Sequence, residues 1–308
     1  MPTLAFSLSL CAAALALSTS APAADQARDD SLARLGAYVD AWERELGSVV
    51  ADETYRQVVT RLPRSGAVRQ PNLVPREIRE LVSEFTLIHF DDGPANWLGY
   101  RAVKRIDGKA VIATGPTLND LLSDATLSWP ERWRRVRDAN AAFNIGPFTR
   151  DANLPTFALA ALRTASHARF TYSAPRSQTL DGRRLTRRTF RERARPTLVA
   201  GERGRDVPLE GTVWFDASEG QVRRTEISLR DGAPQPAAGG REEDRVREEW
   251  LTSRITVTFA PDPGVTAWVP VEMRERYDNS WGETTTGHAL YSRYRRFRTT
   301  ARLVRPGP

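Results

Sequence analysis

The chain of 308 residues has one cysteine, Cys11, three histidines and only two lysines, Lys104 and Lys109. A single cysteine cannot form an intramolecular disulfide or a cysteine zinc site, so a disulfide-stapled mini-protein and a cysteine-ligated zinc domain are excluded. Long uncharged hydrophobic runs are missing beyond the N-terminus, which excludes a multipass membrane protein. With 40% hydrophobic residues, the chain can bury one sizeable core.

Charge is also missing at the N-terminus, where the first charged side chain is that of Asp25. Residues 4–17 are an apolar run, and residues 21–23 (Ala-Pro-Ala) supply the small side chains of a signal-peptidase site. We predict a signal peptide over 1–23, although no Lys or Arg precedes its apolar run. A retained membrane anchor is the alternative. Cleavage would leave a cysteine-free chain suited to an oxidising compartment, so we expect a periplasmic or extracellular protein.

The remaining chain, 24–308, is predicted to form a single domain. Apolar residues spaced three or four apart predict a first helix capped near Ser31. Residues 49–61 fit either an extension of that helix or a strand. Three shorter segments, 117–124, 129–146 and 154–165, predict a helical insertion over about 117–165. The Pro-, Gly- and Ala-rich segment 231–245 predicts a flexible loop.

Alternating apolar and polar residues predict strands in most of the rest, as in 168–174, 187–199 and 254–259. Residues 218–220 predict a hairpin turn. Pro270 has no N–H for a ladder, so its strand should lie at an edge or carry a bulge. The predicted fold class is α+β: a curved antiparallel sheet or incomplete β-barrel, with an N-terminal helix and a helical insertion covering the concave face.

Three C-terminal segments resemble those of a bacterial envelope family. They are GTVWFDASEGQVRRTEISL, ITVTFAPDPGVTAWVPVEMRERY and GHALYSRYRRF. Over about residues 210–300 the chain resembles the LolA/LolB-like group of outer-membrane lipoprotein-sorting proteins and related uncharacterised secreted bacterial proteins. The resemblance implies an incomplete barrel with helices closing a hydrophobic cavity, which binds acyl chains of lipoproteins or other lipids without catalysis. The chain departs from the group in its long helical block and its longer loop at 231–245.

A half-barrel has a concave apolar face that helices, a ligand or a partner must cover. Ten apolar residues at alternating strand positions are predicted to line such a cavity: Phe85, Leu87, Val213, Phe215, Ile255, Val257, Phe259, Val269, Val271 and Met273. Ordinary core packing is the alternative for each of them. The predicted function is a non-enzymatic envelope module that binds a lipid or a lipid-modified partner.

Catalytic and metal motifs are missing as well. His89 and Asp91 would share one face of a strand, but no second histidine lies at ligand spacing. There is no nucleophile elbow, no Ser-x-x-Lys and no glycine-rich phosphate loop. We therefore predict no catalytic residue, no metal and no cofactor. An envelope hydrolase built around His89, Asp91 or His288 is the alternative function.

Arginine supplies nearly all of the basic charge and clusters at 132–137, 183–195 and 293–298. The guanidinium group binds phosphate through two N–H donors at once, which suits anionic envelope lipid or polymer. The predicted anionic-ligand surface consists of Arg293, Arg295, Arg296 and Arg298. Acidic residues in the same segments favour a solvated strand face with cross-strand ion pairs instead. Nucleic acid is not an expected partner of an exported chain. A structural protein that contacts anionic polymer is a third alternative.

Overall fold

The computed structural model describes residues 23–46, 48–61, 76–89, 97–111, 118, 120, 127–148, 150, 153–201, 204–232 and 250–296. The predicted signal peptide, except its last residue, and nearly all of the predicted flexible loop lie outside these residues, so both stay predictions. Within the described ranges, no helix is long and apolar enough to cross a membrane.

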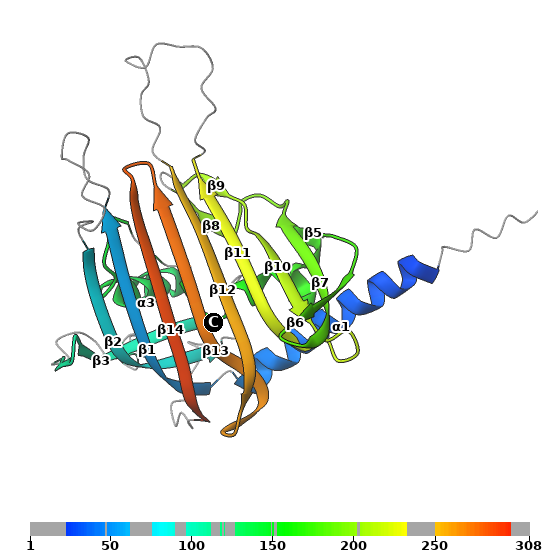
Figure 1. The fold of residues 1–308 in the computed structure, drawn as a ribbon, viewed down its shortest axis with the longest axis horizontal. Helices are drawn as coiled ribbons and strands as arrows, with labels where there is room; N and C mark the ends of the chain where they lie inside the picture. The colour runs from blue at the N-terminus through cyan, green and yellow to red at the C-terminus, as the bar shows by residue number, and fades with distance from the viewer. Residues whose placement is uncertain are drawn as a thin grey trace, which may run out of the picture.

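A single antiparallel sheet of twelve strands forms the body of the molecule (Figure 1). Its order is β4-β3-β2-β1-β14-β13-β12-β11-β10-β7-β5, with β6 paired to β7. The strands are β1 (Ser48–Arg61), β2 (Arg76–His89), β3 (Trp97–Ile106), β4 (Lys109–Ala110), β5 (Phe170–Tyr172), β6 (Arg176–Leu180), β7 (Arg183–Glu192), β10 (Glu210–Phe215), β11 (Val222–Asp231), β12 (Leu251–Asp262), β13 (Val265–Asn279) and β14 (Glu283–Arg296). A separate hairpin pairs β8 (Val199–Ala200) with β9 (Asp206–Val207).

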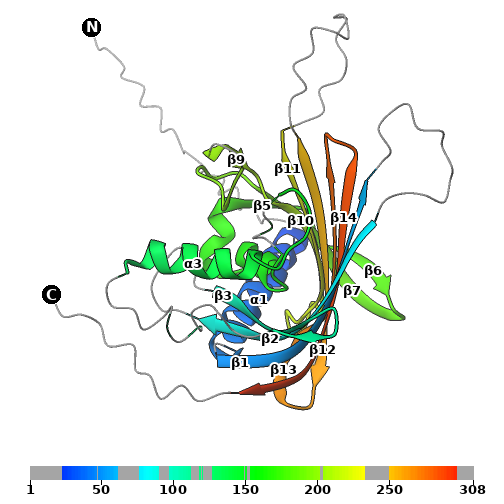
Figure 2. The ribbon, with the colours of Figure 1, turned by 90° about the vertical axis from the view of Figure 1, so that its left-hand side faces the viewer.

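The sheet is curved, and the helices lie on its concave side (Figure 2). They are α1 (Ala23–Leu46), α3 (Trp129–Ala141) and the 3₁₀ helices η1 (Phe157–Ala161) and η2 (Thr164–Arg169). The described strands begin at β4 and end at β5 without closing, so the sheet is an open, incomplete barrel. The predicted fold class is confirmed.

Helix α1 packs its apolar stripe against the concave face of the sheet. Leu35, Val39 and Leu46 are fully buried, and the indole N–H of Trp42 donates a hydrogen bond of 2.6 Å to the carbonyl of Trp268. The prediction that Asp30 or Ser31 caps this helix is wrong, because the helix already begins at Ala23. The Ser31 hydroxyl instead accepts a hydrogen bond from Arg188.

Several predicted boundaries change. Residues 49–61 form strand β1 and do not continue the helix. The segment 154–165 forms two 3₁₀ helices where an α-helix was expected. The strand predicted over 187–199 begins at Arg183 and ends at Glu192, and its hairpin partner β6 was not predicted. Both strands of that hairpin are dominated by polar side chains, so the period-two signal there is weak.

Local turn chemistry behaves as the sequence predicts. The turn around 218–220 joins β10 to β11, and the Asp216 carboxylate accepts a hydrogen bond of 2.8 Å from the backbone N–H of Ser218. This bonding to Ser218 lowers the pKa of Asp216. Strand β13 lies between β12 and β14, so Pro270 is not in an edge strand. The bulge alternative is correct, because the register with β12 shifts there and leaves Val271 without a partner.

Candidate functional site

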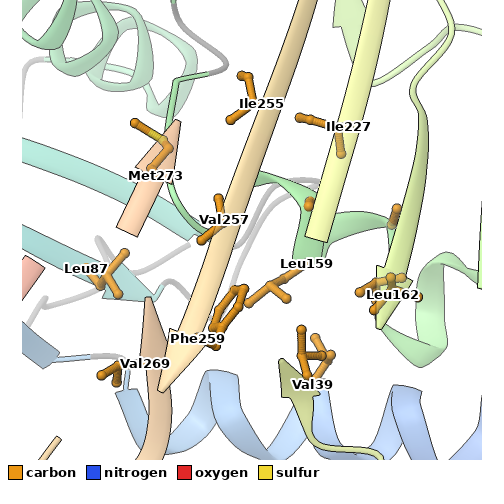
Figure 3. Packing of buried hydrophobic residues seen from close by; sticks show 14 of the residues in the cluster. Val39, Leu87, Leu159, Leu162, Ile227, Ile255, Val257, Phe259, Val269 and Met273 are labelled. Carbon is orange, nitrogen blue, oxygen red and sulfur yellow. The ribbon is translucent and has the colours of Figure 1, made fainter. Parts of the chain in front are cut away.

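The predicted cavity-lining residues lie together on the concave face. All except Val271 belong to one hydrophobic cluster, with exposures of 0 to 3%. In Figure 3, Val257 and Phe259 lie towards Val39 of α1 and Leu159 of η1, so helices cover this part of the sheet. Val271 is half-buried at the bulge and lies outside the cluster. A role for these residues in binding a ligand stays a prediction.

A hollow remains at one end of the concave side. We call it the end hollow; its volume is about 470 Å³, within the range of about 300 to 1,000 Å³ that is usual for ligand pockets. Its walls come from the β8–β9 hairpin, the ends of β11, β12 and β13, and the segment before Arg150. The lining residues are Pro147, Phe148, Arg150, Val199, Ala200, Gly201, Arg205, Val207, Leu229, Asp231, Trp250, Leu251, Ser253, Tyr277, Asn279, Ser280 and Trp281.

Aromatic side chains form much of the rim of the end hollow. Trp281 is 54% exposed in the turn between β13 and β14. Asn279 fixes this turn, since its side-chain oxygen accepts hydrogen bonds of 3.0 Å from the backbone N–H groups of Trp281 and Glu283. Across the hollow, the rings of Phe148 and Tyr277 lie 5.3 Å apart. A large exposed indole beside an apolar wall is a typical feature of a binding site.

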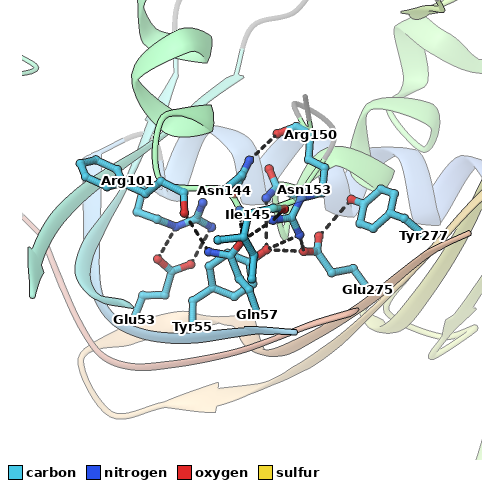
Figure 4. Close-up of polar contacts among 11 residues, drawn as sticks. Glu53, Tyr55, Gln57, Arg101, Asn144, Ile145, Arg150, Asn153, Glu275 and Tyr277 are labelled. Carbon is cyan, nitrogen blue, oxygen red and sulfur yellow. Dashed lines mark hydrogen bonds and ion pairs between the residues drawn. The ribbon is translucent and has the colours of Figure 1, made fainter. Parts of the chain in front are cut away.

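A buried ion pair adjoins the hollow, because Arg150 is one of the lining residues. Figure 4 shows the pair and its hydrogen-bond partners. The Arg150 guanidinium and the Glu275 carboxylate are 2.6 Å apart, and both side chains are fully buried. The hydroxyls of Tyr55 and Tyr277 donate to the same carboxylate. Arg150 also donates to the Gln57 side chain, whereas its Nε–H has no acceptor among the described residues. The surroundings of this ion pair are therefore polar, with one donor left over.

A second buried pair continues this polar cluster towards α3. Arg101 donates hydrogen bonds of 2.5 and 2.8 Å to the two oxygens of Glu53. Its guanidinium lies 4.7 Å from the centre of the Tyr55 ring. The backbone N–H of Arg101 donates to Asn140 of α3 at 2.8 Å, so the helix is joined to the same network.

The tyrosines of the cluster are held in their neutral form. Burial raises the pKa of Tyr55 and Tyr277 well above the usual value, and the nearby Glu275 raises it further. Each phenol therefore stays protonated and donates its hydrogen to the carboxylate. The arrangement contains two arginines, two carboxylates and no histidine, so its formal charges balance.

Sequence reasoning missed Glu53, Arg101, Arg150 and Glu275. A signal was present in strand β1, where Glu53 shares a face with buried Ala51 and Tyr55. Once that segment is taken as a strand, the period of two places Glu53 inside.

Three of the four arginines predicted to form an anionic-ligand surface pair with carboxylates, and their role in binding anions stays a prediction. Arg293 and Arg295 both bind Asp52. Arg295 also lies 2.6 Å from Glu84, and Arg296 lies 3.1 Å from Glu45. Arg298 is outside the described residues. These contacts match the alternative interpretation, a solvated face with cross-strand ion pairs.

Of the residues of the hydrolase alternative, the structure describes only the side chain of His288. The imidazole of His288 lies 2.7 Å from Glu272, and both side chains are partly exposed. His167 contacts the carbonyl of Leu162 at 3.1 Å. The side chain of His89 and all of Asp91 lie outside the described residues. Among the side chains that are described, no group of three or more His, Cys, Asp or Glu residues could hold a metal ion.

No protein-family model and no curated protein matches the chain. Among solved structures it is similar to a LolA superfamily protein from Nitrosomonas europaea, with 9% identity, coverage of 90% of this chain and 94% of that chain, and a TM-score of 0.29. It is similar to a DUF1329 family protein from Desulfovibrio piger ATCC 29098, with 12% identity, coverage of 89% and 95%, and a TM-score of 0.30. It is also similar to MucB in complex with MucA(peri), with 12% identity, coverage of 88% and 100%, and a TM-score of 0.20.

The LolA resemblance found in the C-terminal segments therefore recurs among solved structures. All three TM-scores are below 0.5, so conclusions about function depend on this chain's own side chains.

Proposed function

We propose that this protein is an exported bacterial envelope protein that binds a lipid or a lipid-modified partner in the end hollow. The observation that carries the proposal is the hollow itself, which opens on the concave side of an incomplete barrel beside a cluster of buried apolar side chains. Export rests on the predicted signal peptide and on the cysteine-free chain that follows it.

The lining of the end hollow suits an amphiphile better than a wholly polar ligand. Aliphatic walls such as Val207, Leu229 and Leu251 would remove an acyl chain from water, worth roughly 25 cal/mol for each Å² of apolar surface buried. The hydroxyls of Ser253 and Ser280, which also line the hollow, can hydrogen-bond a polar head group. The exposed indole of Trp281 provides an amphipathic rim.

Two measurements test the proposal. The first is mass spectrometry of lipids that copurify with the protein from its native envelope. The second is titration with a fluorescent long-chain fatty acid. Val199→Trp places a large ring in the half-buried wall of the hollow and should weaken binding at least tenfold. Val82→Trp makes the same exchange at an exposed position of β2 and should leave binding unchanged.

Equal affinities of the wild-type protein and the Val199→Trp variant would place the ligand elsewhere. The absence of both a copurifying lipid and a measurable titration would contradict the proposal as a whole.

A further inference from the structure

A row of arginines around one tryptophan crosses the sheet far from the predicted arginine surface. Arg176 of β6, Arg187 of β7, Trp214 of β10 and Arg224 of β11 are directly opposite one another in successive strand pairs. Residues paired in this way share one face of the sheet. The face is the convex one, because Val213 and Phe215 on either side of Trp214 belong to the concave core.

The charges of this row are not compensated. Within the described ranges, none of the three arginines lies within ion-pair distance of a carboxylate, and the Nε–H of Arg224 is buried without an acceptor. Like charges at directly opposed positions destabilise a sheet, and Arg176 lies opposite Arg187. In contrast, the described arginines of the C-terminal cluster, Arg293, Arg295 and Arg296, are all paired.

Trp214 holds two of the arginines in place. Their guanidinium carbons lie 5.9 Å (Arg187) and 5.4 Å (Arg224) from its ring centre, and its indole N–H donates to Gln178 at 3.0 Å. The ring is only 8% exposed although it lies on the convex face. Stacking uses the face of a guanidinium group and leaves its in-plane N–H donors available for a phosphate.

We propose that this row binds the phosphate groups of anionic phospholipids at a membrane surface. Neighbouring strands lie about 4.8 Å apart, so the row extends over about 14 Å of a convex face. A convex row offers no enclosing cradle for a small anion, whereas a membrane presents many laterally mobile phosphates that can meet all three arginines. Strands β6 and β7 project on the side of the sheet opposite α3, where a flat surface can reach them (Figure 2).

The test measures cosedimentation with vesicles of phosphatidylglycerol mixed with phosphatidylcholine, and with vesicles of phosphatidylcholine alone. The wild-type protein should bind only the anionic vesicles. Arg187→Gln combined with Arg224→Gln should weaken this binding roughly 25-fold, or about fivefold for each arginine. The matched control, Arg293→Gln with Arg295→Gln, removes the same formal charge from paired arginines and should change the affinity less than twofold.

The exposed position of Arg176 provides a second variant that leaves the contacts of Trp214 with Arg187 and Arg224 intact, and Arg176→Gln should weaken binding about fivefold. An equal loss in the matched control would overturn the proposal, since binding would then follow net charge alone. Failure of the wild-type protein to bind anionic vesicles would also overturn it. So would tight binding of soluble pyrophosphate at constant ionic strength with the same dependence on Arg187 and Arg224, because the ligand would then not be a membrane. The Val199→Trp variant should bind vesicles normally, which separates this surface from the end hollow.

Discussion

The two halves of the concave interior are filled in different ways. Under β10 to β12 the sheet meets the apolar sides of α1 and η1, and the contact consists of aliphatic and aromatic side chains. Under β1 and β13 the covering segment around 143–150 is irregular, and its backbone groups have no helix to satisfy them. Gln57 of β1 donates to the carbonyl of Phe143 and accepts from the N–H of Ile145. Some of the polar side chains in this half therefore complete the hydrogen bonds of the irregular segment.

The largest loss of stability is expected when one charge is removed from the polar half. Glu275→Ala leaves Arg150 buried without its partner, and we expect the free energy of unfolding to fall by about 3–5 kcal/mol. Urea denaturation measures it. Glu272→Ala, three residues earlier in β13 and partly exposed, should cost no more than about 1 kcal/mol.

A rescue experiment distinguishes lost charge balance from lost volume. Adding Arg150→Met to Glu275→Ala should restore most of the stability, because no unpaired charge then remains. If the double variant is as unstable as the sum of its parts, the polar half is held by packing, as the apolar half is.

In the apolar half, truncating a buried side chain should lower the free energy of unfolding, and no second substitution should restore it. Leu162→Ala removes a fully buried side chain and should lower the free energy of unfolding by about 2–5 kcal/mol. The control is Leu290→Ala, since that leucine is 49% exposed and its truncation should stay within about 0.5 kcal/mol. Equal losses at the two leucines, in thermal or urea unfolding, would show that helix α1 and η1 do not cover this face in solution.

A smaller effect is expected at Gly287 of β14, whose backbone lies close to the Glu275 carboxylate. A Cβ at Gly287 would lie 2.3 Å from a carboxylate oxygen of Glu275, so Gly287→Ala must displace that carboxylate. We expect a loss of about 1–3 kcal/mol in urea unfolding. In the Glu275→Ala background the same substitution should cost nothing further, and a full loss there would place the clash elsewhere.

The smallest effect is expected at the exposed ion pairs, such as that of Asp52 with Arg295. Hydrogen bonding to Arg295 lowers the pKa of Asp52 below its usual value of 3.8. A carboxyl group whose pKa is lowered by folding stabilises the folded protein above its unfolded pKa, and this contribution is lost as the pH falls through the lowered pKa. Arg295→Gln should therefore lower the free energy of unfolding by about 0–1 kcal/mol near neutral pH.

At a pH well below 3.8, the wild-type protein and the Arg295→Gln variant should be equally stable. A difference that persists in acid would mean that Arg295 acts through packing of its side chain and not through Asp52.

The local features of the fold were accessible from the sequence, whereas the site was not. Alternation placed Ile255, Val257 and Phe259 on the concave face, and the missing N–H of Pro270 predicted a bulge. Those signals act over a few residues. The buried pairs join residues that are 48 and 125 positions apart, and no periodicity couples such distant positions. The end hollow likewise depends on the β8–β9 hairpin, whose strands are too short to be recognised from alternation.

The pairing of β1 with β14 has a consequence for how the molecule is assembled. Val59 lies opposite Thr285, so β1 and β14, the first and last of the described strands, are neighbours in the middle of the sheet. The strands on either side of this seam pair mainly with their sequence neighbours, as β2 does with β3 and β12 with β13. Each flank can therefore form early, but joining them requires a contact across most of the chain, which is a slow event in folding. In a chain synthesised from the N-terminus, the edge of β1 that pairs with β14 would stay unpaired until β14 had emerged.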